Sequence, residues 1–521
     1  MLAPFRFPHL RVAALFCLSA LCASAVQAAP KPADPAVLAR QLDTFIAKGM
    51  QDWQIPGLSI VVVTAQGVVY EKGFGVRAAG QPDKVDPHTL FGMASTAKAL
   101  TSLALAMLVD EGKLQWDDPV IRHLPQLRLP NDYLTSHVTV RDLLRHTSGV
   151  AEADLLWSRE DFSTAEILAR LDRVPATTSL RSDFVYNNVM YQVAGNIVAA
   201  ASGMSWDSFI RSRILQPLGM RESYTTTAAM RAVPQANVSR PHGLIDGKLQ
   251  LMEDSSADAV PAAGGAWSNA HDAGKWLSFL LAGGKVGTQR LVSEASFKEL
   301  LTPQVAVNRA QWLYPTTALT HSRFTAYGLG WFLQDYRGQF AAMHTGSLNG
   351  RTAIIGLLPD AQVAVYAFGN LDHAEFRHAL LWQVLDLYSG APARDWNGEA
   401  LKLYGEIEHT ALAKQAAEVA HRIPDTRPSH PLASYAGTFR HPAWGELSVV
   451  LDGDTLKLAM GSAPDMTSAL THWHYDSFRA RLNSGLGGWD TFTFGTGSDG
   501  SIDSITGLDS TFVRVPAPAA H

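Results

Sequence analysis

A serine and a lysine three residues apart stand in the stretch Gly92-Met93-Ala94-Ser95-Thr96-Ala97-Lys98. The glycine and the Ala/Leu-rich run that continues to Leu108 predict a turn that leads into a buried helix, with Ser95 in its first turn. Because residues three apart are neighbours on a helix, the Lys98 amine can reach the Ser95 hydroxyl. Burial lowers the pKa of a lysine toward its proton-accepting form, so Lys98 would activate Ser95 as a nucleophile. The alternative is a lysine on a solvated helix face, but no charged residue flanks Lys98.

A second polar group, Tyr186-Asn187-Asn188, precedes the helical pattern of residues 193–201. A positive charge nearby favours the phenolate form of a tyrosine, so Tyr186 can serve as the second half of the base beside Lys98. The Asn188 side chain can hold the lysine amine or an amide of the substrate. The alternative is that these residues form only a turn and a helix cap.

A third group, His344-Thr345-Gly346-Ser347, precedes two strand-like runs that are joined at a Pro-Asp turn. This pattern predicts an edge strand that enters a hairpin. The glycine allows close approach to a substrate backbone, and the N–H groups of the strand can point at a developing oxyanion. His344 and Thr345 would then bind a carboxylate of the substrate.

These three groups stand in the order and rough spacing of a known superfamily. The chain resembles the penicillin-binding-protein-like serine hydrolases, which include class C β-lactamases, D-alanyl-D-alanine carboxypeptidases, D-aminopeptidases and related esterases. The resemblance covers about residues 36–390, and Pro217-Leu218-Gly219-Met220 and Tyr327-Gly328-Leu329-Gly330-Trp331 also match it. It implies an α+β fold in which an antiparallel sheet flanked by helices lies beside an all-helical region, with the active site in the cleft between them.

The resemblance also implies roles for individual residues. Ser95 would be acylated, and Lys98 and Tyr186 would share the proton transfer. The N–H groups of Ser95 and Ser347 would form the oxyanion hole. The substrate-binding residues would be Asn188, His344, Thr345, Gly346 and Ser347. Class C β-lactamases carry lysine at the position of His344, and a neutral imidazole attracts a carboxylate less strongly, so we expect inefficient β-lactam hydrolysis.

The N-terminus has the pattern of a signal peptide. Basic residues precede an apolar run over 12–25, and small residues follow up to Ala28, which predicts a signal peptide over 1–28 and a periplasmic or secreted protein. The apolar run is too short for an ordinary membrane span, so we expect no stable span in the mature chain. Both cysteines, Cys17 and Cys22, lie inside this segment, so the mature chain would contain no disulfide.

The sequence predicts two folded domains joined by a helix. The hydrolase domain is expected over 33–395, followed by a helix and linker over 396–430 and a C-terminal antiparallel β domain over 431–518. The helix would pack through an apolar stripe of Leu401, Tyr404, Ile407 and Leu412. Short β-rich runs and tight turns, such as Asp452-Gly453-Asp454, predict a small barrel or sandwich that resembles the lipocalin-like domain of peptidase-like family members.

Several histidines outside these motifs are interpreted as structural. His146 ends a predicted helix that begins at the N-cap Thr139, where Asp142 completes a capping box. His472 and His474 share one face of a predicted strand and could ligate a metal, but the sequence offers no clear third ligand, so packing is the preferred interpretation. No metal or organic cofactor is expected, because the Ser95 chemistry is complete without one.

Composition limits the classes of partner. The chain has 521 residues, is 47% hydrophobic and 17% charged, and carries a net charge of −5, which gives no basic field for nucleic acid. The leading prediction is therefore an exported serine hydrolase that cleaves a small amide, such as a D-amino-acid-containing peptide, through an acyl-enzyme. The alternatives are a carboxylesterase for short acyl esters and a non-catalytic protein that binds muropeptides or β-lactams. The oligomeric state is not indicated.

Overall fold

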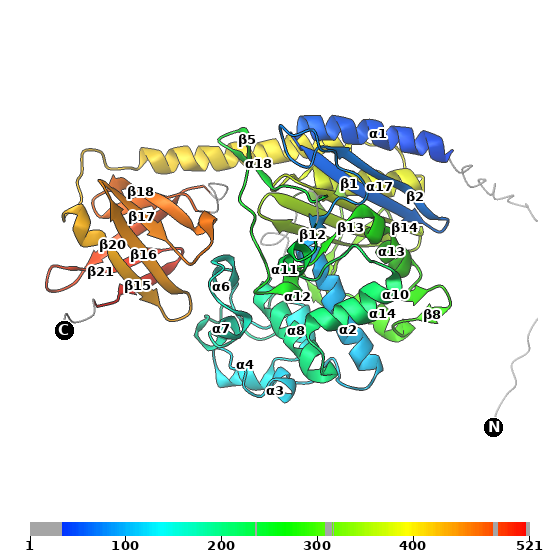
Figure 1. Ribbon diagram of the computed structural model, residues 1–521, viewed down its shortest axis with the longest axis horizontal. Helices are drawn as coiled ribbons and strands as arrows, with labels where there is room; N and C mark the ends of the chain where they lie inside the picture. The colour runs from blue at the N-terminus through cyan, green and yellow to red at the C-terminus, as the bar shows by residue number, and fades with distance from the viewer. Residues whose placement is uncertain (1–33, 235–236, 308–314, 316, 483–487, 517–521) are drawn as a thin grey trace, which may run out of the picture.

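The computed structural model describes residues 34–516 apart from 235–236, 308–314, 316 and 483–487. The predicted signal peptide over 1–28 lies outside the described residues. Figure 1 shows a larger body that contains a broad sheet and many helices, a smaller barrel, and one long helix that runs from the first to the second.

The larger body is organised around an eight-stranded sheet in which neighbouring strands run antiparallel. In spatial order the strands are β2 (Gly67–Gly75), β1 (Gly57–Thr64), β14 (Val363–Gly369), β13 (Arg351–Leu358), β12 (Gln339–Leu348), β11 (Phe332–Tyr336), β10 (Thr325–Tyr327) and β9 (Val305–Ala306). Three two-stranded sheets pair β3 (Phe91–Gly92) with β6 (Trp267–Ser268), β4 (His242–Ile245) with β5 (Lys248–Leu251), and β7 (Lys285–Val286) with β8 (Gln289–Arg290).

The central strands are apolar throughout because both faces of the sheet are covered. Successive side chains of a strand point to opposite faces, so Val61 and Val63 of β1 join one hydrophobic core while Leu58, Ile60 and Val62 join the other. One face is covered by α13 (Ala270–Leu281), and the other by α17 (Phe376–Ser389) with α1 (Pro35–Asp52) packed beside it. In this arrangement β12 lies next to the helical region.

The helical region lies beside the sheet and begins at the predicted nucleophile. Its elements are η1 (Ala94–Ala97), α2 (Lys98–Asp110), α3 (Val120–His123), α4 (Asp132–His137), α5 (Val140–Leu144), α6 (Leu155–Ser158), α7 (Thr164–Leu168), η2 (Leu171–Arg173), α8 (Asn188–Ser202), α9 (Trp206–Ile210), η3 (Arg211–Leu215), α10 (Gln216–Leu218), α11 (Thr227–Arg231), α12 (Pro261–Gly264), α14 (Glu294–Leu300) and α16 (Thr317–Thr320). The predicted capping box at the start of α5 is confirmed, with reciprocal bonds between Thr139 and Asp142.

The smaller body is a closed barrel of eight antiparallel strands, which confirms the predicted small β domain. The strands are β15 (Gly437–His441), β16 (Gly445–Asp452), β17 (Thr455–Ala459), β18 (Thr467–His474), β19 (Ser477–Ala480), β20 (Asp490–Thr496), β21 (Ile502–Gly507) and β22 (Ser510–Arg514), with the turns η4 (Leu432–Tyr435) and η5 (Pro464–Met466). The α+β fold class is thus confirmed for the described residues.

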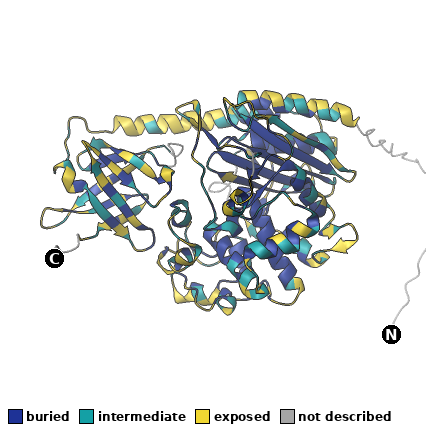
Figure 2. Cartoon of the chain, viewed as in Figure 1, coloured by how far each residue is buried: buried dark blue, intermediate teal, exposed yellow. Residues whose placement is uncertain are grey.

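The helix between the two bodies, α18 (Trp396–Ala420), differs from its prediction. Only its first turn is buried, at Trp396, Asn397 and Ala400, while Ile407 and Leu412 are exposed. The predicted apolar stripe packs only in its first half: Leu401 and Tyr404 are half-buried, and the Tyr404 ring lies edge-on to Trp53. Its second half, Ile407 and Leu412, is wrong as a packing surface, because there the helix crosses the space between the bodies (Figure 2).

The barrel also contacts the hydrolase body directly, at the segment that follows α6. The Arg159 guanidinium donates to the carbonyl oxygens of Trp444 and Glu446, and the Arg159 carbonyl accepts from the Ser462 N–H at 2.8 Å. The Ser462 hydroxyl donates to the Glu160 carbonyl at 2.9 Å. These bonds tie the α6 segment both to the start of β16 and to the loop that precedes η5.

Along the described chain, no helix is both long enough and apolar enough to cross a bilayer.

Candidate active site

Ser95 stands on a sharp turn between β3 and α2. Ala94 has φ of +46°, in the left-handed region that residues with a side chain rarely adopt, and this turns the chain abruptly into η1. Thr96 stabilises the turn by donating from its hydroxyl to the Met93 carbonyl at 2.6 Å. The Ala94 backbone also packs against Gly264 of α12, where a Cβ would lie 3.2 Å from the Ala94 carbonyl carbon. The turn places Ser95 on the pocket surface at the N-terminal end of the helix.

The end of β12 lies directly against this turn. Its partner β11 pairs with β12 only as far as Met343, so the segment from His344 to Leu348 is paired on one side and open on the other. The predicted edge is therefore local, because β12 is an interior strand over its first half. At Gly346 an added Cβ would lie 2.5 Å from the Met93 carbonyl oxygen and 3.0 Å from the Ser95 nitrogen, so only glycine permits this approach.

Lys98 is fully buried and its amine points at Ser95. The Nζ atom lies 2.9 Å from Ser95 Oγ, 2.7 Å from Asn188 Oδ1 and 2.9 Å from the Ala263 carbonyl oxygen. Ser95 lies on η1, immediately before α2, and the other two partners lie on α8 and α12, which pack on each other and on α2. The predicted proximity of Ser95, Lys98 and Asn188 is thus what the geometry shows.

Burial makes this lysine an effective proton acceptor near neutral pH. Desolvation lowers the pKa of Lys98 to about 7, and the nearby negative charge of Asp154 opposes part of that shift. Burial together with the Lys98 charge also lowers the pKa of both His146 and His344, so these two imidazoles stay neutral. A base whose pKa lies near the working pH is what general base catalysis needs.

Tyr186 lies beside Lys98 and faces the lysine amine with its aromatic ring. The Lys98 Nζ lies 4.8 Å from the centroid of the Tyr186 ring, close enough for a cation–π contact when the lysine is charged. The ring of His146 lies 4.3 Å from that of Tyr186, and His146 Nδ1 accepts the Asn187 N–H at 3.1 Å. This contact fits the structural role predicted for His146, because it holds the segment that precedes α8.

His344 does not lie where a carboxylate-binding residue is expected. Its side chain is 1% exposed, with Nε2 at 3.0 Å from the Tyr327 hydroxyl and Nδ1 at 2.6 Å from the Thr345 carbonyl. Thr345 is also buried, at 4% exposed. Burial and the Lys98 charge lower the pKa of His344 to about 3, so it carries no positive charge for a substrate carboxylate. Neither side chain is among the described residues that line the cavity, so the structure does not show their expected contact with the substrate-binding space.

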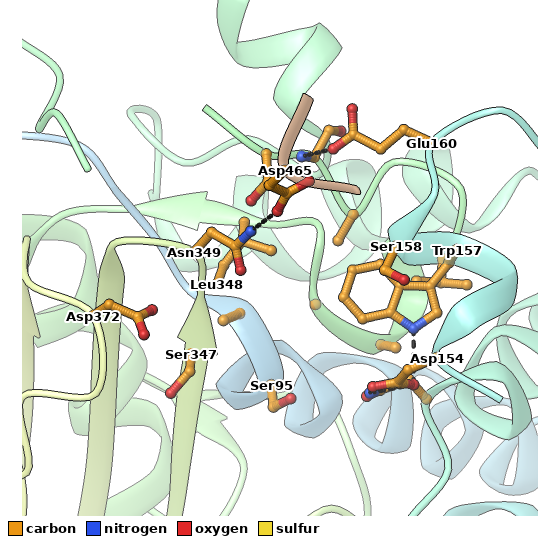
Figure 3. Close-up of a pocket in the computed structure, with 18 of the residues that line it drawn as sticks. Ser95, Asp154, Trp157, Ser158, Glu160, Ser347, Leu348, Asn349, Asp372 and Asp465 are labelled. Atoms are coloured by element: carbon orange, nitrogen blue, oxygen red, sulfur yellow. Dashed lines mark hydrogen bonds between the residues drawn. The ribbon is translucent and has the colours of Figure 1, made fainter. Parts of the chain in front are cut away.

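A cavity of about 250 Å³ opens above Ser95, and Figure 3 shows the side chains that line it. Of the predicted residues it contains Ser95, Asn188 and Ser347. The Ser347 hydroxyl accepts from the Arg377 guanidinium at 2.7 Å, which fixes this end of β12. Arg377 in turn pairs with Glu375.

The same cavity holds carboxylates that the sequence patterns did not reveal: Asp154, Glu160, Asp372 and Asp465. The last comes from η5 of the barrel and accepts from the Asn349 amide, while Glu160 accepts the Ser256 N–H at 2.7 Å. Burial raises the pKa of both Glu160 and Asp465, and the charge of Asp465 adds to the shift at Glu160. These residues belong to no local motif, because each is brought to the cavity by the tertiary fold.

No cluster of three or more histidine, cysteine, aspartate or glutamate side chains suited to a metal ion occurs within the described parts of the chain. The His472 Nε2 atom lies 2.9 Å from the Tyr475 carbonyl oxygen, within its own hairpin.

The fold and the site together define a class of protein, a serine hydrolase whose Ser-x-x-Lys pair lies between an antiparallel sheet and a helical region. Residues 42–389 match the family model described as Beta-lactamase, and the chain belongs to this family. Residues 421–513 match a second model, described as a domain of unknown function, DUF3471. The chain therefore belongs to a family of serine hydrolases, and the alternative of a non-catalytic binding protein is not supported.

Individual relatives have low sequence identity to this chain, but the similarity extends over most of its length. The chain is 26% identical over 439 residues to the unguisins hydrolase ungD of Aspergillus violaceofuscus, covering 79% of this chain and 76% of the relative. It is 24% identical over 353 residues to Protein flp of Staphylococcus aureus, covering 64% and 63%.

Solved structures show the same fold. The octameric penicillin-binding protein homologue from Pyrococcus abyssi superimposes with a TM-score of 0.61 at 23% identity, over 91% of this chain and 99% of that one. The crystal structure of SurE with D-Leu gives a TM-score of 0.55 at 22% identity, over 92% and 100%. The similarity therefore extends over both bodies of the chain.

Proposed function

We propose that this serine hydrolase forms an acyl-enzyme on Ser95 and cleaves a small amide whose acyl group carries a free amine, such as a D-amino-acid-containing peptide. The observation that carries the proposal is the buried Lys98 amine, 2.9 Å from Ser95 Oγ and with a pKa of about 7. At neutral pH a large fraction of Lys98 is uncharged and can accept the serine proton.

The reaction proceeds in two halves. Ser95 Oγ attacks the amide carbon while its proton passes to Lys98, with Tyr186 sharing the transfer, and the oxyanion accepts hydrogen bonds from the N–H groups of Ser95 and Ser347. The proton then moves to the leaving amine, and the C–N bond breaks. Water, deprotonated by the same base, attacks the ester; the bond between the acyl carbon and Ser95 Oγ breaks, the base returns the proton to Oγ, and the acid leaves.

The choice of a cationic substrate rests on the charge of the cavity. Its described lining residues include Asp154, Glu160, Asp372 and Asp465 but no lysine or arginine. His373 also lines the cavity and pairs with Asp372, which raises the pKa of the imidazole, so Asp154, Glu160 and Asp465 are the carboxylates left for a substrate cation. Partly buried carboxylates are stabilised by an ammonium group, whereas a substrate carboxylate would be repelled. This favours an aminopeptidase-like over a carboxypeptidase-like substrate. The D configuration is supported by the family resemblance and by the D-leucine bound to SurE.

Matched chromogenic substrates test the proposal. D-alanine p-nitroanilide should be hydrolysed with kcat/KM about ten- to a hundredfold above that of N-acetyl-D-alanine p-nitroanilide, because acetylation removes one charge-assisted contact. L-alanine p-nitroanilide serves as the stereochemical control. The Asp465→Asn variant should show a smaller preference for the free amine while still turning over the acetylated compound.

Other outcomes would change the assignment. Equal or faster hydrolysis of the acetylated substrate would contradict the cationic specificity. Turnover of p-nitrophenyl acetate with no hydrolysis of any anilide would instead establish the carboxylesterase.

We also propose that the protein is exported, on the support of the basic, apolar and small-residue pattern of residues 1–28. Expression of the full chain in a bacterial host should give a periplasmic or secreted protein whose N-terminal sequence begins at Ala29. Recovery of the chain in the cytosol with Met1 retained would contradict this.

A further inference from the structure

We propose that Asp154 is a positioning residue for the catalytic base: it holds the Asn188 amide in the one orientation that presents an acceptor to the Lys98 amine. The inference rests on the proposed function, since it concerns the group that activates Ser95. Asp154 lies immediately before α6 and belongs to none of the motifs found in the sequence.

The geometry defines which way the amide faces. The Asn188 Nδ2 atom lies 3.0 Å from both carboxylate oxygens of Asp154, while Asn188 Oδ1 lies 2.7 Å from Lys98 Nζ. A carboxylate only accepts hydrogen bonds, so the reversed amide would set oxygen against oxygen at Asp154 and nitrogen against nitrogen at Lys98. The carboxylate thus acts on the lysine through the amide, as the last member of a chain of three side chains.

The carboxylate is itself held from both sides. Asp154 Oδ1 accepts the Trp157 indole N–H at 2.8 Å, which fixes its rotation against α6 (Figure 3). The segment that follows α6 is tied to the barrel through Arg159, as described above. The barrel therefore supports the element that aims the base.

The same arrangement places the negative charge of Asp154 near Lys98, whose pKa is lowered by burial. The titratable groups around Lys98 are Asp154 before α6, His146 after α5, His344 on β12, and the tyrosines Tyr186 and Tyr191. The two imidazoles are neutral, and burial raises the pKa of Tyr191. Asp154 is the group whose charge raises the pKa of Lys98.

One further carboxyl group adjoins Asp154. Burial and the charge of Asp154 raise the pKa of Glu152 to about 7. The titration of Glu152 must therefore be separated from that of Lys98 in the test.

The test follows acylation of Ser95 by a fluorophosphonate, with rates measured from pH 5 to pH 9 by intact mass. In the pH profile of this rate, the acidic limb is the region in which the rate rises with pH. Asp154→Asn, which removes the charge at constant shape, should move the midpoint of the acidic limb by about half to one pH unit toward lower pH. Asp154→Ala should show the same displacement and a further rate loss of about tenfold or more, because the amide is no longer oriented. Asp154→Glu retains the charge and should keep the limb at its original pH.

Two controls separate this role from a merely structural one. Asp172→Asn makes the same charge change at η2, on the surface, and should leave both the rate and the limb unchanged. Glu152→Gln shows how much of the limb belongs to the neighbouring carboxyl group, and it should leave the displacement caused by Asp154→Asn intact.

The results that overturn the inference are distinct from those that overturn the proposed function. An Asp154→Asn variant with the parent's limb, or variants that all lose rate to the same extent with no displacement, would overturn the positioning role alone. If Asp154→Asn failed to fold, a shift of the acidic limb in Asp154→Glu would still contradict the positioning role. A parent protein that is not labelled on Ser95 would refute the proposed function and this inference with it.

Discussion

Replacing Ser95 with alanine is expected to abolish covalent labelling and to lower kcat by about five to six orders of magnitude, the loss typical of a missing nucleophile. Its hydroxyl contacts Lys98, and its removal leaves the turn at Ala94 and the close approach of Gly346 in place. The cost in unfolding free energy should therefore be only about 1 kcal/mol, as for one lost hydrogen bond. Intact mass after fluorophosphonate treatment and a time course with D-alanine p-nitroanilide check both effects.

The matched control is Ser158→Ala, which removes another hydroxyl from the same cavity. It should keep the adduct on Ser95, as peptide mapping would show. Persistent stoichiometric labelling of Ser95→Ala would reject Ser95 as the nucleophile.

Lys98→Met is expected to lower kcat by about three to four orders of magnitude, because removal of the general base leaves the serine protonated. The parent enzyme should show a rate that rises from pH 6 to pH 8, since Lys98, with a pKa of about 7, accepts a proton only when it is neutral. Below that pH the ammonium form predominates and activity falls. The residual rate of Lys98→Met should lack this limb, as a pH profile of kcat/KM would show.

Thermal unfolding of Lys98→Met must accompany the kinetics, because Asn188 Oδ1 and the Ala263 carbonyl lose a donor in this variant. A folded variant with a flat residual profile supports the role of the base. A parent profile that is flat across pH 6 to 8, or a folded variant with nearly full activity, would contradict it.

The parts of the site that the sequence predicted are those set by local spacing. Ser95 and Lys98 meet because they are three positions apart at a helix start. Asn188 is the first residue of helix α8, close to where its motif predicted a helix. The barrel was predictable because its strands alternate in polarity and are joined at tight turns such as Asp452-Gly453-Asp454.

The parts that the sequence did not reveal depend on distant segments. Whether His344 faces substrate or core is decided by Tyr327 on β10, and no pattern within the motif carries that information. Asp154 and Asp465 are more than three hundred residues apart in the chain, yet they line one cavity. On α18 the expected apolar stripe packs at Leu401 and Tyr404 but not at Ile407 and Leu412, because an apolar stripe alone does not say how far along a helix a neighbour extends.

The contribution of η5 to the cavity has a consequence for the order in which the molecule matures. Ser95, Lys98 and Asn188 all belong to the first two fifths of the chain, whereas Asp465 emerges near its end. During synthesis from the N-terminus, the reactive serine is made long before the wall that faces it. The cleft is therefore complete only once the barrel has folded, and a chain that stops after α18 lacks both this wall and the Arg159 contacts that hold the α6 segment.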